Sequence, residues 1–224
     1  MRPRDRSFLA LLLCLTFTFP ACAAELEKLS VAYPKRAFIG TPKDVPKAIL
    51  DRTEKLPDKP REIVVPAGTV LLSKGKPVKS SDEAPIIGSL DLITDGDKEA
   101  TDGSWVELGP GKQWVQIDLG APAAIHAILI WHAHNEARIY FDVVVQVSDD
   151  PSFAKGVTTL FNNDVDNSSG LGIGQQPMYL ETYQGKAIDA KGVKGRYVRL
   201  YSGGNTADDQ NHYSEVEVYG TKSE

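Results

Sequence analysis

The chain has 224 residues, of which 42% are hydrophobic and 25% charged, and its formal net charge is −5. This length and apolar fraction allow a domain with a hydrophobic core of its own, without disulfide bonds to hold it. The acidic balance argues against nucleic acid or an anionic membrane surface as a partner, because both are bound through basic patches.

The first 23 residues are typical of a secretory signal peptide. Three arginines within the first six positions precede an apolar run over 8–19, which is too short to span a bilayer. The segment Ala21-Cys22-Ala23 has the small residues that a signal peptidase prefers, with cleavage after residue 23 or 24. Cys22 leaves lipid attachment open as an alternative, although the residues before it suit that modification poorly. We therefore expect an exported protein, periplasmic, cell-surface or secreted, with no membrane span.

Both cysteines, Cys14 and Cys22, fall within this signal. The mature chain is therefore expected to contain no disulfide, although it is exported to a compartment where disulfides form. Cleavage after residue 23 leaves 22 basic and 29 acidic residues, a net charge of −7. That charge is compatible with neutral glycans, cationic partners and calcium.

Residues 24–66 are rich in proline and charge, as in the run Leu56-Pro57-Asp58-Lys59-Pro60. Proline at this density interrupts both helices and strand ladders. One short helix is expected around 43–55, where Ile49 and Leu50 are the apolar residues. The segment is interpreted as an extension that wraps the following domain or links it to the cell surface, and as partly disordered.

From residue 67 to 224 the pattern becomes that of alternating β segments separated by turn residues. Expected strands cover 115–119, 125–131, 140–147, 157–161, 197–201 and 216–219. They recur without a convincing long helix between them, which favours an all-β fold, an antiparallel jelly-roll β-sandwich, over a parallel α/β sheet.

Five segments of this region resemble, in the same order, the discoidin or coagulation factor type C family (F5/8 type C), whose members are galactose-binding-like jelly rolls. The segments are Thr94–Asp97, Gln113–Gly120, Val143–Ser148, Arg196–Arg199 and Glu215–Gly220. Each is weak alone, but together they span nearly all of the chain after the extension. The resemblance implies the discoidin-like fold more firmly than a function, because this fold hosts sugar, lipid and protein binders.

The resemblance also implies a structural calcium ion. Asp95, Asp97 and Glu215 would supply oxygen ligands, and Thr101 would give a hydroxyl and a carbonyl. Further oxygens would come from the backbone carbonyls of Leu92, Asp97 and Ser214. The family threonine usually follows the first aspartate by five residues, whereas Ala100 holds that position here and Thr101 comes one later. The alternative is an ordinary Asp-Gly turn with Glu215 as a surface charge.

The segment 131–138 is the most probable ligand-binding loop, with His134, Asn135 and Arg138 as its candidate residues. Sugar-binding members of the family hold ligands on strand-connecting loops, where planar polar groups bind hydroxyls and an aromatic ring packs on the sugar. The alternative is a solvated loop in which Arg138 pairs with Glu136. We therefore expect a carbohydrate or glycoconjugate as the partner.

Two further metal patterns are weaker. His132 and His134 form a His-x-His pair, but no third zinc ligand is obvious nearby. Asp164, Asp166 and Ser168 match the first alternate positions of a calcium loop, yet its later glycine and glutamate positions hold other residues. A glycine-rich solvated loop that forms part of a binding rim is the favoured interpretation there.

No nucleophile and base pair can be nominated from the sequence, so the chain is interpreted as a binding module and not as an enzyme. The leading hypothesis is an exported, non-catalytic module for carbohydrate or glycosylated surfaces, with structural calcium. The alternative hypothesis is a scaffolding module that contacts another protein of the cell envelope, for which the proline-rich extension and one face of the sandwich are the candidate contacts.

Overall fold

A computed structural model describes residues 25–37 and 40–222 of the chain. The expected signal peptide, with Cys14 and Cys22, lies outside the described residues. The elements in chain order are β1 (Leu26–Lys28), α1 (Lys47–Leu50), β2 (Val64–Pro66), β3 (Val70–Leu71), β4 (Val78–Ser80), the 3-10 helix η1 (Leu90–Thr94), β5 (Val106–Leu108), β6 (Gln113–Trp131), β7 (Val144–Ser148), β8 (Thr158–Asn162), β9 (Lys186–Ser202), β10 (Asn211–Tyr213) and β11 (Glu215–Lys222). Within the described part of the chain, no helix has the length and apolarity needed to cross a membrane.

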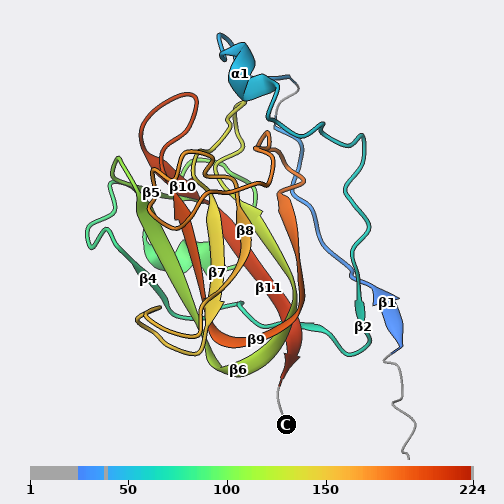
Figure 1. The fold of residues 1–224 in the computed structure, drawn as a ribbon. Helices are drawn as coiled ribbons and strands as arrows, with labels where there is room; N and C mark the ends of the chain where they lie inside the picture. Colours follow the sequence, from blue (N-terminus) through green and yellow to red (C-terminus); the bar gives the residue numbers. More distant parts are fainter. Residues whose placement is uncertain (1–24, 38–39, 223–224) are drawn as a thin grey trace, which may run out of the picture.

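The antiparallel sandwich expected from the sequence is confirmed, and it is built on two long strands that bend together. β6 pairs with β9 along both halves, and the register shifts between Asp118 and Ala123, where the strands turn from one layer into the other. Gly120 permits this turn because its φ of +88° is a conformation that side-chain-bearing residues rarely adopt. The first half of β6 lies beside β4, and its second half lies beside β11 (Figure 1).

The predicted strands 115–119 and 125–131 are therefore the two halves of one strand. In the first half, Val115 and Ile117 point into the core between the layers, which explains the alternation in the sequence. The second half is apolar on both faces because both faces are covered. Ile128 and Ile130 belong to the core, while Leu129 and Trp131 belong to a second apolar cluster on the outer side of the sheet.

That outer cluster is covered by residues from the segments 25–37 and 40–66, which we call the strap. Leu29, Tyr33 and Ile63 of the strap pack on it, and the ring of Tyr33 meets that of Trp131 edge-on with centroids 6.4 Å apart. Strands β1 and β2 pair with each other and form a two-stranded sheet apart from the main sheet. The strap runs along one side of the sandwich (Figure 1).

The helix expected around 43–55 is much shorter than expected. α1 begins after Pro46 and ends at Leu50. The chain then turns away because the backbone of the strap pairs with the loop between β8 and β9. The amide of Glu54 donates to the carbonyl of Met178 over 2.8 Å, and the amide of Met178 donates to the carbonyl of Arg52 over 3.0 Å.

Strap and sandwich also share a largely buried ion pair. The Lys186 ammonium lies 2.7 Å from Glu54 Oε1, and the exposed fractions of the two side chains are 9% and 21%. The same ammonium lies 5.0 Å from the ring centroid of Tyr179. Since a buried cation needs a counter-charge, this pair ties the position of the strap to the sandwich.

We predict that Glu54→Gln lowers the free energy of unfolding by about 2 kcal/mol, because it leaves the Lys186 ammonium buried without a carboxylate. Urea unfolding at neutral pH measures the change. The control is Glu62→Gln, which breaks the exposed pair with Lys28 and should have no measurable effect. Equal effects of the two substitutions would show that the strap does not depend on the buried pair.

Candidate functional site

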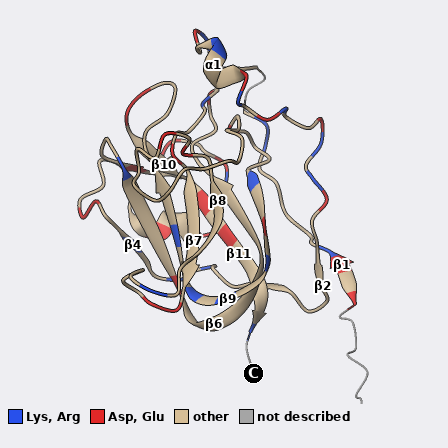
Figure 2. Cartoon of the chain, viewed as in Figure 1, with Lys and Arg blue, Asp and Glu red and all other residues tan. Residues whose placement is uncertain are grey.

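The structure brings the Asp95 loop and the last strand together. The helix η1 ends at Thr94 with Asp95 as its C-cap, and the next amide, that of Gly96, donates to Glu215 Oε2 over 2.9 Å. Glu215 opens β11 opposite Trp131 and is fully buried. Figure 2 shows red segments on β11, the strand that carries both Glu215 and Glu217. Two segments that are 119 residues apart in the sequence therefore meet at one carboxylate.

The carboxylate of Glu215 is incompletely satisfied. Its Oε1 is buried and has no hydrogen-bond partner among the described residues. Burial raises the pKa of Glu215 to about 8, against the lowering effect of the Gly96 amide, and the nearby carboxylates of Glu217 and Asp95 raise the pKa further. A buried oxygen without a donor is costly, and oxygen donors of this kind suit a hard cation such as calcium.

The remaining expected calcium ligands lie on an exposed loop with regular turns. The amide of Asp97 donates to Asp95 Oδ1 over 2.7 Å, and the amide of Glu99 donates to Asp97 Oδ1 over 2.9 Å. Ala100 has a φ of +48°, and this left-handed residue accommodates the extra position before Thr101. The Thr101 carbonyl accepts hydrogen bonds from the hydroxyl and amide of Ser104, so it is already used within a turn.

A second buried carboxylate lies beside this loop and has its own cation. Lys98 Nζ lies 2.5 Å from Glu217 Oε1, and both side chains are less than a tenth exposed. The Lys98 ammonium is also 4.7 Å from the ring centroid of Trp131, and the Tyr219 hydroxyl donates to Glu217 Oε2 over 2.8 Å. Glu217 is therefore satisfied by protein groups, in contrast to Glu215.

The three residues expected to bind a ligand do not form one surface. Asn135 is exposed, but His134 is fully buried, and its Nε2 donates to the carbonyl of Lys98 over 2.7 Å. Arg138 is 9% exposed and donates to Asp208 over 3.1 Å and to Glu136 over 3.0 Å. The expectation for His134 is thus corrected to a support for the loop that carries Lys98. The pairing of Arg138 with Glu136 was the alternative left open by the sequence.

The His-x-His pair divides between different partners. His132 Nδ1 shares a hydrogen bond of 2.9 Å with Glu181 Oε2, and both residues are fully buried. The imidazole stacks on Tyr140 with centroids 4.2 Å apart and lies 4.8 Å from Tyr213. His132 is therefore part of a polar and aromatic cluster inside the sandwich, whereas His134 bonds to the backbone near the Asp95 loop.

A cleft of about 380 Å³ lies at the end of the sandwich that carries α1, and we call it the loop-end cleft. Four separate segments form it: α1 and the residues after it, the β6–β7 loop, the β8–β9 loop and the start of the β9–β10 loop. The lining residues are Ala48, Ile49, Arg52, Phe141, Asp142, Val165, Asp166, Met178 and Gly203. One aromatic ring, two carboxylates and one guanidinium thus face a space of the size of a sugar residue.

Sequence reasoning missed most of this cleft. Asp166 lies in the loop that we interpreted as part of a binding rim, and that loop indeed contributes to the cleft. Phe141 and Asp142 follow directly after the candidate loop, but they were assigned to a strand. A φ of +52° at Asp142 breaks that strand, and β7 begins at Val144 instead. No pattern in the sequence placed Arg52 there.

The two carboxylates that line the cleft lie beside a third, that of the fully buried Asp164. Asp142, Asp164 and Asp166 have oxygens that all lie within 4.8 Å of one another. The Ser168 hydroxyl donates to Asp142 Oδ2 over 2.8 Å, and the amide of Ser169 donates to Asp164 Oδ2 over 2.9 Å. Burial raises the pKa of Asp142, and the charges of the other two aspartates add to the rise. Carboxylates held in this way are acceptors fixed in direction for the hydroxyls of a ligand.

The buried imidazole of His212 makes the stability of the domain depend on pH. Burial lowers its pKa to about 4, and the Arg138 guanidinium, 3.2 Å away, lowers it further. The unfolded chain has the ordinary histidine pKa of about 6.5, so it binds more protons than the native state below that pH. The contribution of His212 to stability is therefore complete above pH 6.5 and is lost as the pH falls towards 4.

We predict that wild-type protein loses about 2 kcal/mol more unfolding free energy between pH 7 and pH 5 than His212→Asn does. Urea unfolding at the two pH values measures this difference. His126→Asn is the control, because His126 is only half-buried and should change the pH dependence much less. Parallel pH profiles for wild type and His212→Asn would contradict the prediction.

Comparisons with known proteins agree with this fold. The family model described as a NedA-like, galactose-binding domain of F5/8 type C matches residues 92–200. Two structures of a family 89 glycoside hydrolase from Clostridium perfringens align at 17% identity over 69% of this chain. The TM-scores are 0.51 for the complex with GlcNAc-alpha-1,4-galactose and 0.50 for the complex with 2-acetamido-1,2-dideoxynojirmycin.

In both alignments the matched part is only 15% of the hydrolase chain. A fucose-binding module from Streptococcus pneumoniae aligns at 19% identity over 68% of this chain and 99% of its own, with a TM-score of 0.49. None of the curated proteins matched the chain. The chain therefore carries, at residues 92–200, a galactose-binding-like domain of the F5/8 type C family.

Proposed function

We propose that this protein is an exported, non-catalytic module that binds carbohydrate in the loop-end cleft and holds a structural calcium ion beside Glu215. The observation that carries the proposal is the cleft itself, which combines Phe141 with the carboxylates of Asp142 and Asp166 at one end of a galactose-binding-like domain. The expected partner is thus a carbohydrate or glycoconjugate.

The cleft has the groups that sugar recognition requires. The ring of Phe141 provides an apolar surface for the C–H face of a pyranose. Asp142 and Asp166 accept hydrogen bonds from sugar hydroxyls, and Arg52 donates hydrogen bonds from a planar guanidinium. Because Arg52 comes from the strap, the binding site includes residues outside the part that matches the family.

The composition of the cleft supports binding without chemistry. Among its described lining residues, the titratable groups are two aspartates and one arginine, with no histidine, lysine or cysteine. The lining residues therefore include no Ser–His or Cys–His pair of nucleophile and base. Turnover of a glycoside or an ester that is abolished by Asp142→Asn would overturn the non-catalytic assignment.

Calcium would stabilise the domain by joining the Asp95 loop to β11. Asp95 and Glu215 would supply carboxylate oxygens, and Asp97 lies on the same loop. The buried oxygen of Glu215 without a partner supports this assignment. The ion would satisfy that oxygen and offset the repulsion between the carboxylates of Asp95 and Glu215, which the Gly96 amide alone relieves only in part.

The second candidate function is that of a scaffolding module, which binds another protein of the cell envelope. The observation that favours it is a pair of exposed apolar side chains on the two-stranded sheet of the strap, Leu26 at 66% exposure and Val64 at 52%. A pull-down that recovers one stoichiometric partner, insensitive to deglycosylation and lost in Leu26→Ser/Val64→Ser, would favour this function over sugar binding.

We predict that Phe141→Ala and Asp166→Asn each weaken the binding of a galactose-containing oligosaccharide by at least about tenfold, since each removes a direct contact. Isothermal titration of a ligand identified by a glycan screen measures the change. Asp58→Asn, a substitution with the same charge change at an exposed position of the strap, should bind normally. Unchanged affinity in both cleft variants would place the sugar site elsewhere.

We predict that calcium raises the midpoint of thermal unfolding relative to chelator, because an ion that binds only the native state stabilises it. Glu215→Gln and Asp95→Asn should both abolish the shift. Asp91→Asn, at an exposed position of η1 one turn earlier, is the control and should keep it. A shift that survives in Glu215→Gln would exclude this carboxylate as a ligand.

A further inference from the structure

A second recess lies at the end of the sandwich opposite α1, beside the bend of β6 and near the C-terminal end of the described chain (Figure 1). Its volume is about 530 Å³. We call it the basic recess, because three lysines line it and no acidic residue does. The lining residues are Leu71, Leu72, Lys74, Lys76, Leu119, Gly120, Ala121, Pro122, Ala123 and Lys222.

The three lysines of the recess come from two separate segments of the chain. Lys74 and Lys76 lie in the turn that follows β3, and Lys222 is the last residue of β11. The backbone at Gly120 lies against Lys76, whose Nζ would be 3.4 Å from a Cβ at that position. The pairing of Lys222 with Ala123 places the third lysine next to the bend of β6. The recess is thus formed by the same bend that joins the two layers.

In the described part of the chain, the lysines of the recess have acidic neighbours but no direct carboxylate partner: Lys74 Nζ would be 2.8 Å from a Cβ at Gly96, which stands between Asp95 and Asp97. None of the three ammonium groups forms an ion pair there, and the charge of Lys76 acts on Asp118, whose pKa it lowers only as a minor cause. Asp118 already binds the Arg196 guanidinium through two contacts, of 2.7 and 2.8 Å. The recess is therefore a positively charged region on a chain whose net charge is −5.

We propose that the basic recess binds the anionic groups of an acidic polysaccharide, such as the carboxylates of a polyuronate or the sulfates of a sulfated glycan. Ammonium groups bind both kinds of oxyanion as mobile point charges, without the fixed geometry of a guanidinium. The exposed residues Ala121 and Pro122 of the wall offer an apolar surface for the C–H face of a sugar ring next to its charge.

The surroundings favour a polymer over a membrane. Leu72, Leu119 and Ala123 in the wall are less than a tenth exposed, so they have little surface to insert into lipid. Among the described residues, none of the large apolar side chains that are strongly exposed lines the recess. Membrane binding through basic residues normally combines charge with inserted apolar or aromatic groups.

This site does not rest on the proposed sugar binding in the loop-end cleft, because it lies at the other end of the sandwich and shares no residue with that cleft. The experiment measures the affinity of the mature protein for polygalacturonate and for its methyl ester, which is the same polymer without the charges. Dextran sulfate and neutral dextran form a second pair. We expect binding to the charged member of each pair alone, and weaker binding at high salt.

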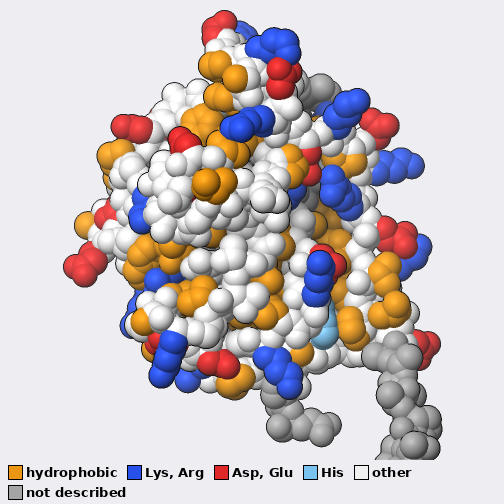
Figure 3. Space-filling model, viewed as in Figure 1, with side chains coloured by type: hydrophobic (Ala, Val, Ile, Leu, Met, Phe, Trp, Pro, Cys, Tyr) orange, Lys and Arg blue, Asp and Glu red, His pale blue; other side chains and the backbone are white. Residues whose placement is uncertain are grey.

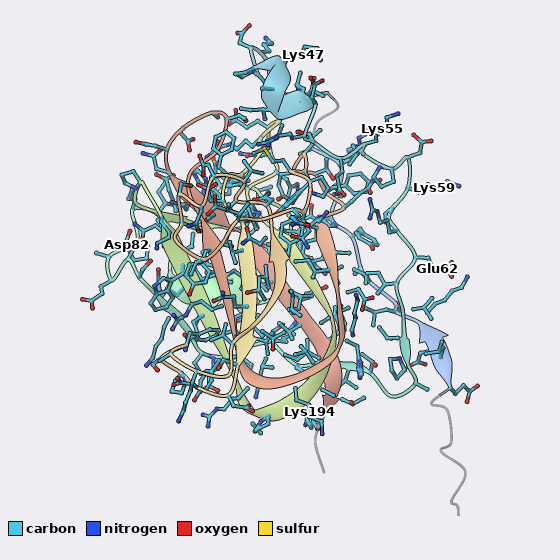
Figure 4. All side chains as sticks on the ribbon, in the orientation of Figure 1. Lys47, Lys55, Lys59, Glu62, Asp82 and Lys194 are labelled. Carbon is cyan, nitrogen blue, oxygen red and sulfur yellow. The ribbon has the colours of Figure 1, made fainter. Side chains whose placement is uncertain are left out.

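The variant Lys74→Gln/Lys76→Gln/Lys222→Gln should lose at least about tenfold in affinity for the charged polymers. The matched control is Lys43→Gln/Lys55→Gln/Lys59→Gln, which makes the same change in net charge on the strap. Figure 4 shows that Lys55 and Lys59 point away from the sandwich. The triple lysine-to-arginine variant should retain binding. The triple lysine-to-glutamine variant should bind a neutral oligosaccharide of the loop-end cleft as wild type does, so that failure of this site and of the loop-end cleft can be told apart.

Several outcomes would overturn the proposal. They are no binding to either charged polymer, equal binding to the methyl ester, and an equal loss in the strap control. Preferential binding of phosphatidylglycerol vesicles over the charged polymers would assign the recess to lipid instead. Unfolding midpoints equal to that of wild type show that a lost affinity does not come from a lost fold.

Discussion

The pairing of β6 with β9 carries the architecture, because every other strand of the main sheet is hydrogen-bonded to one of these two or to a neighbour of one. Both strands bend at the same level, so one continuous ladder supplies both layers of the sandwich. Because of this bend, the two ends of the sandwich differ. Connecting loops converge at one end, and tight turns close the other. The polar groups that suit ligands lie at these ends, while the faces between them are packed.

Trp131 links several parts of the molecule that are remote in the sequence. It is the last residue of β6, it pairs with Glu215, its ring receives Tyr33 from the strap, and it lies below the Lys98 ammonium. The Asp95 loop and the strap are therefore held against the same indole. The surface in Figure 3 gives little sign of this arrangement, since acidic and basic side chains are interspersed over the face that it shows.

Much of the fold can be predicted from the sequence, because the alternation at 115–119 and the five ordered segments reflect local pattern and family. The meeting of Asp95 with Glu215 was likewise expected from the resemblance. Side-chain burial could not be predicted in the same way. His134 and Arg138 look like surface groups in a polar loop, yet tertiary contacts bury both. The loop-end cleft needs Arg52 and Phe141 to meet, and contacts between distant segments, such as the backbone pairing at Met178, bring the strap there.

The strap has a consequence for how such a domain can diversify. It forms one wall of the loop-end cleft, but its strands β1 and β2 pair only with each other and not with the main sheet. Substitutions around Arg52 would therefore alter the proposed binding site without changing a residue of the main sheet. In that proposal, part of the cleft comes from a segment outside the main sheet, so the preference for a ligand could change over evolutionary time without substitutions in the core strands.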